Sequence, residues 1–169
     1  MGVTPGQSTK SGAGRRQVLE AFGTVSVVGV GLIGASLVQA LRRAGDRGRI
    51  LGVSGARTVE EAKALGLIDD GFPYADLPAV AARSDLVVLS SPIASILEHI
   101  RILGARGGEL RPGTVITDVG STKRAIVRTA LDHLPEHVSF VGGHPLAGSE
   151  QTGLRAADPF LFENCYYVL

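Results

Sequence analysis

The chain has 169 residues and a formal net charge of +1 at pH 7, with 44% hydrophobic and 20% charged residues. This length and composition indicate a single globular domain that buries a sizeable core. The nearly balanced charge and the lack of a long apolar run disfavour nucleic acid and membranes as partners. The single cysteine, Cys165, excludes an internal disulfide and is predicted to be a buried structural thiol.

Within residues 1–22, the stretch to about Gly14 is rich in glycine, serine and threonine and has no hydrophobic periodicity. Residues 1–22 are therefore predicted to be a disordered tail ahead of a dinucleotide-binding domain at residues 23–169. Arg15 and Arg16 resemble a twin-arginine export signal. However, Glu20 interrupts the segment between these arginines and the apolar stretch, and that apolar stretch is explained as the first strand of the fold. A cytoplasmic location is therefore predicted.

The apolar, β-branched stretch that begins at Val25 predicts a strand buried on both faces. Gly29, Gly31 and Gly34 follow it in the spacing G-x-G-x-x-G, and an amphipathic run then predicts a helix that ends near Gly45. This order of strand, turn and helix is the context in which the spacing indicates dinucleotide binding. The alternative is a glycine-rich turn without a ligand.

Each glycine has a separate expected task. Gly29 allows the tight turn, Gly31 lets a pyrophosphate approach the backbone, and Gly34 lets the helix pack against the strand. The backbone N–H groups at the helix start, which include Leu32 and Ile33, are expected to point at the phosphates.

The rest of the chain alternates between strand and helix patterns. Thr58 and Glu61 have the spacing of a capping box, and Ser121 is a plausible N-cap. This alternation predicts an α/β fold with a doubly wound, mostly parallel sheet of the Rossmann type, with ligands at the carboxyl ends of the strands. Strands are predicted at 50–53, 86–89, 114–119 and 138–141, with a brief edge strand in 66–72 and a last strand from about 166; helices are predicted at 58–65, 76–83, 93–103 and 122–134.

The loop after the second strand bears on the choice of cofactor. NAD-binding folds usually place a carboxylate there, but this chain has Ser54 and, three residues later, Arg57. Ser54 can donate a hydrogen bond and Arg57 can pair with a 2′-phosphate, which favours NADP over NAD. Alternatively, Arg57 is only a solvated charge. Ser91 and Pro92, at the end of a later strand, are further candidates for cofactor binding.

His144 is the candidate general base, because it follows a buried strand inside a glycine-rich loop and can exchange a proton near neutral pH. A structural role is the alternative. The other histidines, at 99, 133 and 137, are predicted to be solvated. Ser121 either orients a histidine or the cofactor or merely caps a helix, and Glu150 is expected on the same rim. No metal site is predicted.

Three motifs give the chain a family resemblance. They are Gly-Val-Gly-Leu-Ile-Gly-Ala-Ser at 29–36, Thr-Asp-Val-Gly-Ser-Thr-Lys at 117–123 and Gly-Gly-His-Pro-Leu-Ala-Gly-Ser-Glu at 142–150. With them, residues 25–169 resemble the prephenate/arogenate dehydrogenase family of tyrosine biosynthesis. The resemblance implies an oxidative decarboxylation, in which a ring carbon gives a hydride to NAD(P), a histidine takes the hydroxyl proton and carbon dioxide leaves.

The same resemblance implies roles for residues at matching positions. His144 would be the base, Ser121 would position it and the nicotinamide, and Glu150 would shape the substrate site with the adjoining Gly148 and Ser149. The Ser54…Arg57 pattern looks like the NADP-using arogenate branch. The substrate would be arogenate or prephenate.

Family enzymes continue into a helical domain that forms a homodimer and completes the substrate site. The sequence ends at Leu169, so we expect this C-terminal domain to be absent and the dinucleotide-binding domain to be truncated. Two other functions stay open: another hydroxyacid dehydrogenase with the same cofactor domain, which would not explain the His144 loop, and a non-catalytic nucleotide-binding module.

Overall fold

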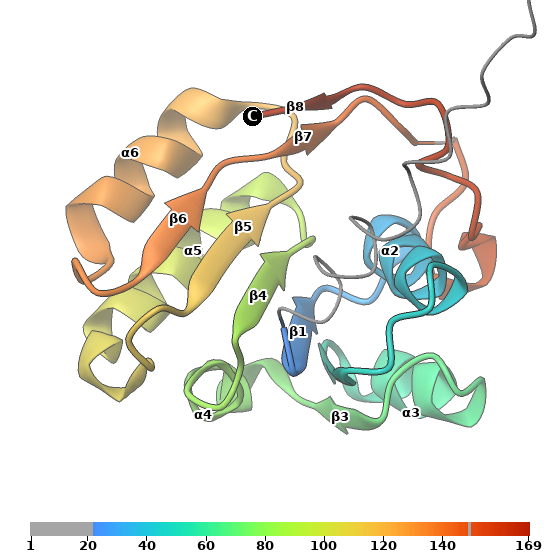
Figure 1. Ribbon diagram of the computed structural model, residues 1–169, viewed down its shortest axis with the longest axis horizontal. Helices are drawn as coiled ribbons and strands as arrows, with labels where there is room; N and C mark the ends of the chain where they lie inside the picture. Colours follow the sequence, from blue (N-terminus) through green and yellow to red (C-terminus); the bar gives the residue numbers. More distant parts are fainter. Residues whose placement is uncertain (1–21, 149) are drawn as a thin grey trace, which may run out of the picture.

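The computed structural model describes residues 22–148 and 150–169. Within these ranges six strands form one sheet in the order β3-β2-β1-β4-β5-β6, and every neighbouring pair is parallel. The order reverses between β1 and β4, so the predicted doubly wound Rossmann-type sheet is confirmed (Figure 1). The strands are β1 (Thr24–Val28), β2 (Arg49–Val53), β3 (Asp70–Phe72), β4 (Leu86–Leu89), β5 (Val115–Asp118) and β6 (Ser139–Val141).

Helices cover both faces of the sheet. Residues of α2 and α3 join one hydrophobic cluster with one face of the central strands, and residues of α4, α5 and α6 join a second cluster with the opposite face. The helices are α2 (Leu32–Arg43), α3 (Ala56–Ala64), α4 (Leu77–Ala81), α5 (Ile93–Ala105) and α6 (Lys123–His133), with 3-10 turns η1 (Tyr74–Asp76), η2 (Gly107–Glu109) and η3 (Leu154–Ala156).

The central strand β1 is buried on both faces, as its β-branched sequence predicts. Successive side chains of a strand point to opposite faces. Accordingly, Val27 belongs to the cluster beneath α2 and α3, whereas Val28 belongs to the cluster beneath α4, α5 and α6. Phe22, the first described residue, packs against the cluster that contains Val27, and the other residues of the predicted tail lie outside the described ranges.

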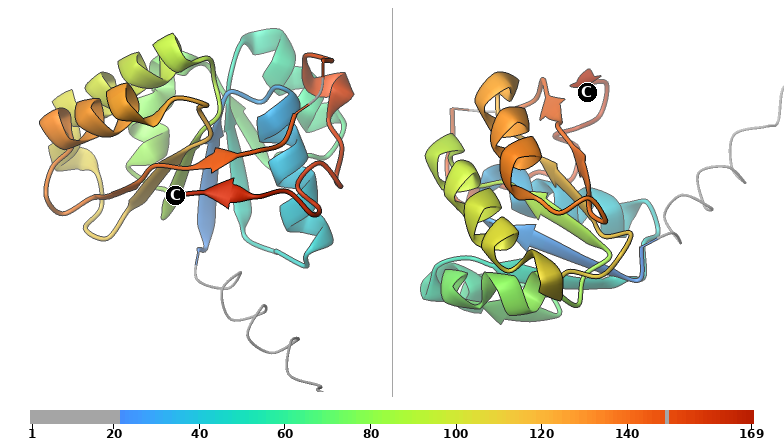
Figure 2. Two further views of the ribbon diagram at one scale, coloured as in Figure 1. Left: turned by 90° about the horizontal axis from the view of Figure 1, so that it is seen from above. Right: turned by 90° about the vertical axis from the view of Figure 1, so that its left-hand side faces the viewer.

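The last predicted strand forms, but it does not join the large sheet. β7 (His144–Pro145) pairs with β8 (Tyr167–Val168) in a separate antiparallel sheet, in which His144 is opposite Val168. Figure 1 shows this pair beyond the arrowheads of β4, β5 and β6, and the left view of Figure 2 shows the two strands side by side. The carboxyl edge of the large sheet therefore faces β7 and β8.

The two predicted side-chain caps are wrong. α3 begins two residues before Thr58, with extended Gly55 as its N-cap and no side-chain cap, so Thr58 lies inside the helix and its backbone N–H donates to the Gly55 carbonyl at 2.9 Å. α6 has Thr122, rather than Ser121, at its N-cap, again without a side-chain hydrogen bond. At both helices no side chain caps the first N–H groups, so those without a backbone partner stay available to other acceptors.

Cys165 is half-buried, so the prediction of a buried thiol is wrong. Its segment, between η3 and β8, runs along the surface of the domain. None of the helices in the described ranges is long and apolar enough to cross a bilayer. In the same ranges, no three histidine, cysteine, aspartate or glutamate side chains gather in a way that would hold a metal ion.

Candidate functional site

The three glycines of the fingerprint differ in what surrounds them. Gly29 follows β1 with φ +95°, and a Cβ there would lie 2.7 Å from the backbone nitrogen of Ser91. A Cβ on Gly34 would collide with the Gly29 carbonyl oxygen, so the expected tight turn and close helix packing are both confirmed. A Cβ on Gly31, the N-cap of α2, would meet nothing within 4 Å. This open space fits a group that approaches the backbone.

These surroundings predict that two alanine substitutions affect different properties, one the stability of the fold and the other dinucleotide binding. Gly34→Ala is expected to destabilise the fold by about 3 kcal/mol, because the backbone must shift to relieve the collision. Gly31→Ala is expected to change stability by less than about 1 kcal/mol while it weakens dinucleotide binding at least about tenfold. Urea unfolding and calorimetric titration measure the two effects. Equal stability losses, or unchanged binding in the Gly31 variant, would contradict this assignment.

A cleft of about 200 Å³ opens where the strand order reverses, and we call it the switch-point cleft. Ligands of open α/β sheets bind at such a position. Five of the predicted cofactor residues border it together, whereas Leu32, Ile33, Gly34 and Arg57 do not. The bordering residues are Gly29, Val30, Gly31, Ser54, Thr58, Tyr74, Ser90, Ser91, Pro92, Gly153 and Leu154.

The residues outside the cleft lining adjoin it along the chain. Leu32 and Ile33 form the first turn of α2, which has neither a side-chain cap nor an acidic residue. Arg57 is exposed on the first turn of α3, directly after the loop that begins with Ser54. Ser54 itself is buried, and its Oγ lies 3.5 Å from the hydroxyl oxygen of Tyr74. Both helix starts are thus free of negative side chains, as an anion would require.

His99 is buried rather than solvated, with 7% of its surface exposed, so that prediction is wrong. Its ring stacks on Tyr74 with the centroids 5.2 Å apart, and its Nδ1 lies 3.2 Å from the Oγ of Ser91. Sequence reasoning missed both Tyr74 and His99. A signal was present, because His99 follows the core residue Ile96 by three positions and therefore shares its helix face.

Burial lowers the pKa of His99 below its ordinary value of 6.5, an effect larger than the opposing one of the Glu98 carboxylate. The unfolded chain therefore binds this proton more readily than the folded one. Hence the contribution of His99 to stability is fully present above pH 6.5 and is lost as the pH falls through the lowered pKa.

His99→Gln is expected to flatten the fall in the free energy of unfolding between about pH 7.5 and pH 5.5. Urea unfolding at a series of pH values measures this dependence. His133→Gln is the matched control, because it replaces a histidine that is exposed at the end of α6. Identical pH dependence in the wild type and the His99 variant would contradict the prediction.

A buried ion pair joins the loop before His144 to the end of β5. Asp118 is fully buried and pairs with Lys123, the first residue of α6. The Asp118 carboxylate accepts hydrogen bonds from the backbone N–H groups of Gly120 at 2.8 Å and Gly143 at 3.3 Å. Lys123 Nζ donates to the Gly143 carbonyl at 2.6 Å. The structure therefore brings the 117–123 and 142–148 motifs together; we call these contacts the Asp118–Lys123 clamp.

The clamp lies next to the candidate catalytic residues. His144 is half-buried in β7, directly after the clamped Gly143. Ser121 is exposed in the turn between β5 and α6, so it belongs to the same pair of loops. Gly148 and Glu150 are exposed further along, and Ser149 lies outside the described residues. The functions of these residues stay predictions.

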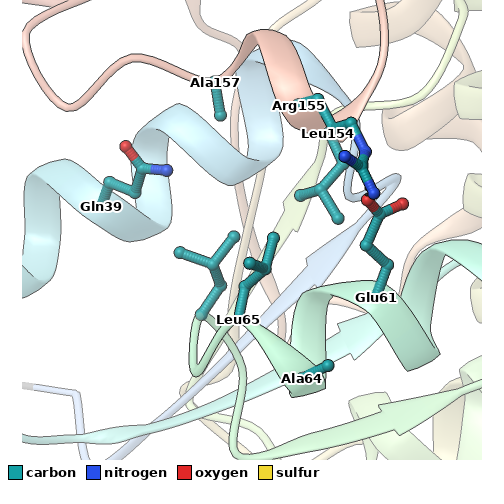
Figure 3. Close-up of a pocket in the computed structure, with 8 residues that line it drawn as sticks. Gln39, Glu61, Ala64, Leu65, Leu154, Arg155 and Ala157 are labelled. Carbon is teal, nitrogen blue, oxygen red and sulfur yellow. Dashed lines mark ion pairs between the residues drawn. The ribbon is translucent and has the colours of Figure 1, made fainter.

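A larger cavity, of about 600 Å³, lies between α2 and α3 beneath η3 (Figure 3). Its walls include Gln39 from α2 and Leu65 directly after α3, and the guanidinium of Arg155 pairs with the Glu61 carboxylate at 2.6 Å. None of the predicted site residues borders this cavity. This larger cavity lies in the helix layer, whereas ligands of such folds bind at the strand ends. We therefore take the switch-point cleft as the candidate site.

Known proteins are similar to this chain in sequence and fold. The family described as prephenate dehydrogenase, nucleotide-binding domain, matches residues 37–169. The prephenate dehydrogenase of Lactococcus lactis is 38% identical over 146 residues, which are 86% of this chain and 40% of that protein. The crystal structure of prephenate dehydrogenase from Aquifex aeolicus, in complex with hydroxyphenyl propionate and NAD+, superposes with a TM-score of 0.75 and 34% identity.

Synechocystis arogenate dehydrogenase is a further structural neighbour, with a TM-score of 0.73 and 36% identity. Each of these two structures covers 85% of the present chain. The chain in turn covers 49% of the Aquifex aeolicus chain and 48% of the Synechocystis chain. The chain therefore spans about half the length of these two solved proteins and 40% of the Lactococcus lactis protein.

Proposed function

The chain belongs to the prephenate dehydrogenase family through its nucleotide-binding domain, and from this premise we propose that it binds NAD(P) and supplies the proton acceptor for the oxidative decarboxylation of prephenate or arogenate. The observation that carries the proposal is the Asp118–Lys123 clamp, which holds the loop before His144 at the carboxyl end of β5. The same edge of the sheet carries the switch-point cleft. As parts of this proposal, the whole protein is a cytoplasmic homodimer, which the family resemblance supports.

The residues of the cleft fit a dinucleotide. The space beside Gly31 would take the pyrophosphate, and the first turn of α2 offers it the N–H groups of Leu32 and Ile33. Ser54 borders one side of the cleft and Ser91 with Pro92 the other. When bound, the nicotinamide accepts the hydride from the substrate.

The other steps use side chains of the 117–123 and 142–150 motifs. His144 accepts the proton of the hydroxyl on the ring carbon that loses the hydride, so that this C–O bond becomes a carbonyl. The bond between the ring and its carboxylate then breaks, carbon dioxide leaves, and the electron pair of that bond enters the ring. The ring becomes aromatic as the carbonyl oxygen takes a proton back and becomes a phenol hydroxyl. Ser121 positions His144 and the nicotinamide ring. Gly148, Ser149 and Glu150 shape the substrate side.

We further propose that NADP is preferred over NAD. Residues 54–57 contain no carboxylate, and Arg57 is exposed on the first turn of α3, where the helix N-terminus also favours an anion. A 2′-phosphate would be paired by Arg57 and hydrogen-bonded by Ser54. NAD stays the alternative, because the Aquifex aeolicus relative was solved with NAD+.

Calorimetric titration of the purified chain with NADP and with NAD tests this proposal. NADP is expected to bind at least about tenfold more tightly, a difference of about 1.4 kcal/mol. Arg57→Gln is expected to remove most of that difference and to leave NAD affinity within about twofold. Arg128→Gln is the matched control, because Arg128 is exposed on α6, on the other side of the sheet.

Two results would contradict the proposal in different ways. Equal affinities, or a preference for NAD, would remove the NADP assignment and leave dinucleotide binding intact. Failure of a folded chain to bind either cofactor would remove the proposed binding role itself.

A further inference from the structure

Tyr74 is an aromatic side chain on the wall of the switch-point cleft. It lies in η1, directly after the edge strand β3, and 39% of its surface is exposed. Large aromatic side chains usually bury much of their surface in the core or at an interface. The exposed ring of Tyr74 instead borders a cleft that the fingerprint glycines also border.

The ring of Tyr74 is held in place from behind. His99 of α5 stacks on it with the two ring planes 19° apart, which is an offset-stacked geometry within the favourable range of distances. His99 is in turn held by Ser91, and the Tyr74 hydroxyl lies near Ser54. The four residues come from the ends of β2, β3 and β4 and from α5, so they connect the two sides of the cleft.

The position of Tyr74 in the sheet decides which half of a dinucleotide it can meet. A dinucleotide crosses the switch point, with its pyrophosphate at the start of α2. His144 directly follows Gly143, which the clamp holds at the end of β5, on one side of the switch point between β1 and β4. Tyr74 follows the edge strand β3, on the other side. With the nicotinamide next to His144, the adenosine half lies on the side of Tyr74.

We propose that the adenine base of the cofactor stacks on Tyr74, with the His99 ring as its backing. The proposal rests on the proposed function, because it needs a dinucleotide in the switch-point cleft. A purine offers a flat π-face of the size of the exposed ring, and aromatic stacking of this kind does not depend on the 2′-phosphate. Tyr74 therefore contributes to the affinity for both NAD and NADP, whereas Arg57 distinguishes them.

The test is calorimetric titration of the purified chain with ADP-ribose, which contains the adenine but not the nicotinamide. Tyr74→Ala and Tyr74→Leu are expected to raise the Kd about tenfold, because neither offers an aromatic face. Tyr74→Phe keeps the face and is expected to stay within about twofold of the wild type. Tyr166→Ala is the matched control, because Tyr166 is 80% exposed and does not border the cleft. Circular dichroism and thermal unfolding check that each variant folds.

The outcomes separate this inference from the proposed function. If the wild type binds ADP-ribose and Tyr74→Ala and Tyr74→Leu bind it equally well, the stacking role alone is overturned. Equal losses in the Phe and Ala variants also overturn it, because the hydroxyl rather than the ring would then bind. A folded wild-type chain that binds none of ADP-ribose, NAD and NADP overturns the proposed function and the stacking role together.

Discussion

His144→Asn is expected to lower kcat for the oxidation of prephenate or arogenate by about 10²- to 10⁴-fold, the usual contribution of a general base. Asparagine keeps a polar side chain of similar size but cannot accept the hydroxyl proton. Fold stability should change little, since His144 is half-buried and its backbone is held by pairing with Val168. The measurement is the steady-state rate of reduced-cofactor formation, in a chain extended beyond Leu169 to the length of the relatives.

Two controls make the result specific to proton transfer. The affinity for ADP-ribose, which lacks the nicotinamide, should be unchanged in His144→Asn, because the switch-point cleft does not include His144. His137→Asn should keep the wild-type rate, because His137 is exposed and lies before β6. A His144 variant that keeps kcat within about threefold would exclude His144 as the base.

Lys123→Met is expected to destabilise the fold by about 3 kcal/mol, because it leaves the Asp118 carboxylate buried without its counter-charge. The side chain of Asp118 is 0% exposed and that of Lys123 is 25% exposed, so the pair is largely shielded from water. The substitution also removes the hydrogen bond to the Gly143 carbonyl. The measurement is the shift of the urea midpoint at constant slope, which gives the change in free energy of unfolding.

The double variant Asp118→Asn/Lys123→Met tests whether the loss comes from the unpaired charge that Asp118 would carry in the core. Because the carboxylate is then neutralised, the double variant should be more stable than the sum of the two single losses predicts. Arg128→Met on α6 is the matched control, since its ion pair with Asp132 lies on the surface and is worth less than about 1 kcal/mol. A similar loss of unfolding free energy in Lys123→Met and in Arg128→Met would contradict a special role for the clamp.

Local patterns in the sequence were sufficient for most of the fold. Side chains repeat with a fixed period along a strand and along a helix. The β-branched run that begins at Val25 and the apolar spacing of the later helices can therefore be recognised from the order of the residues alone. The positive φ of Gly29 and the crowding around Gly34 follow from a turn whose sequence signature is equally local. Helix starts were less certain, because Gly55 and Thr122 take the cap positions without a side-chain hydrogen bond.

The sequence by itself thus determined the alternation of strands and helices, the fingerprint turn and the candidate base His144. Only the tertiary structure decided that His99 is buried against Tyr74 and that Asp118 contacts Gly143, which is 25 residues away in the chain. It also decided that β8 pairs with β7 outside the large sheet. The physical reason is that such contacts depend on strand order and on how helices cross the sheet, and the spacing of residues within one segment carries no information about either.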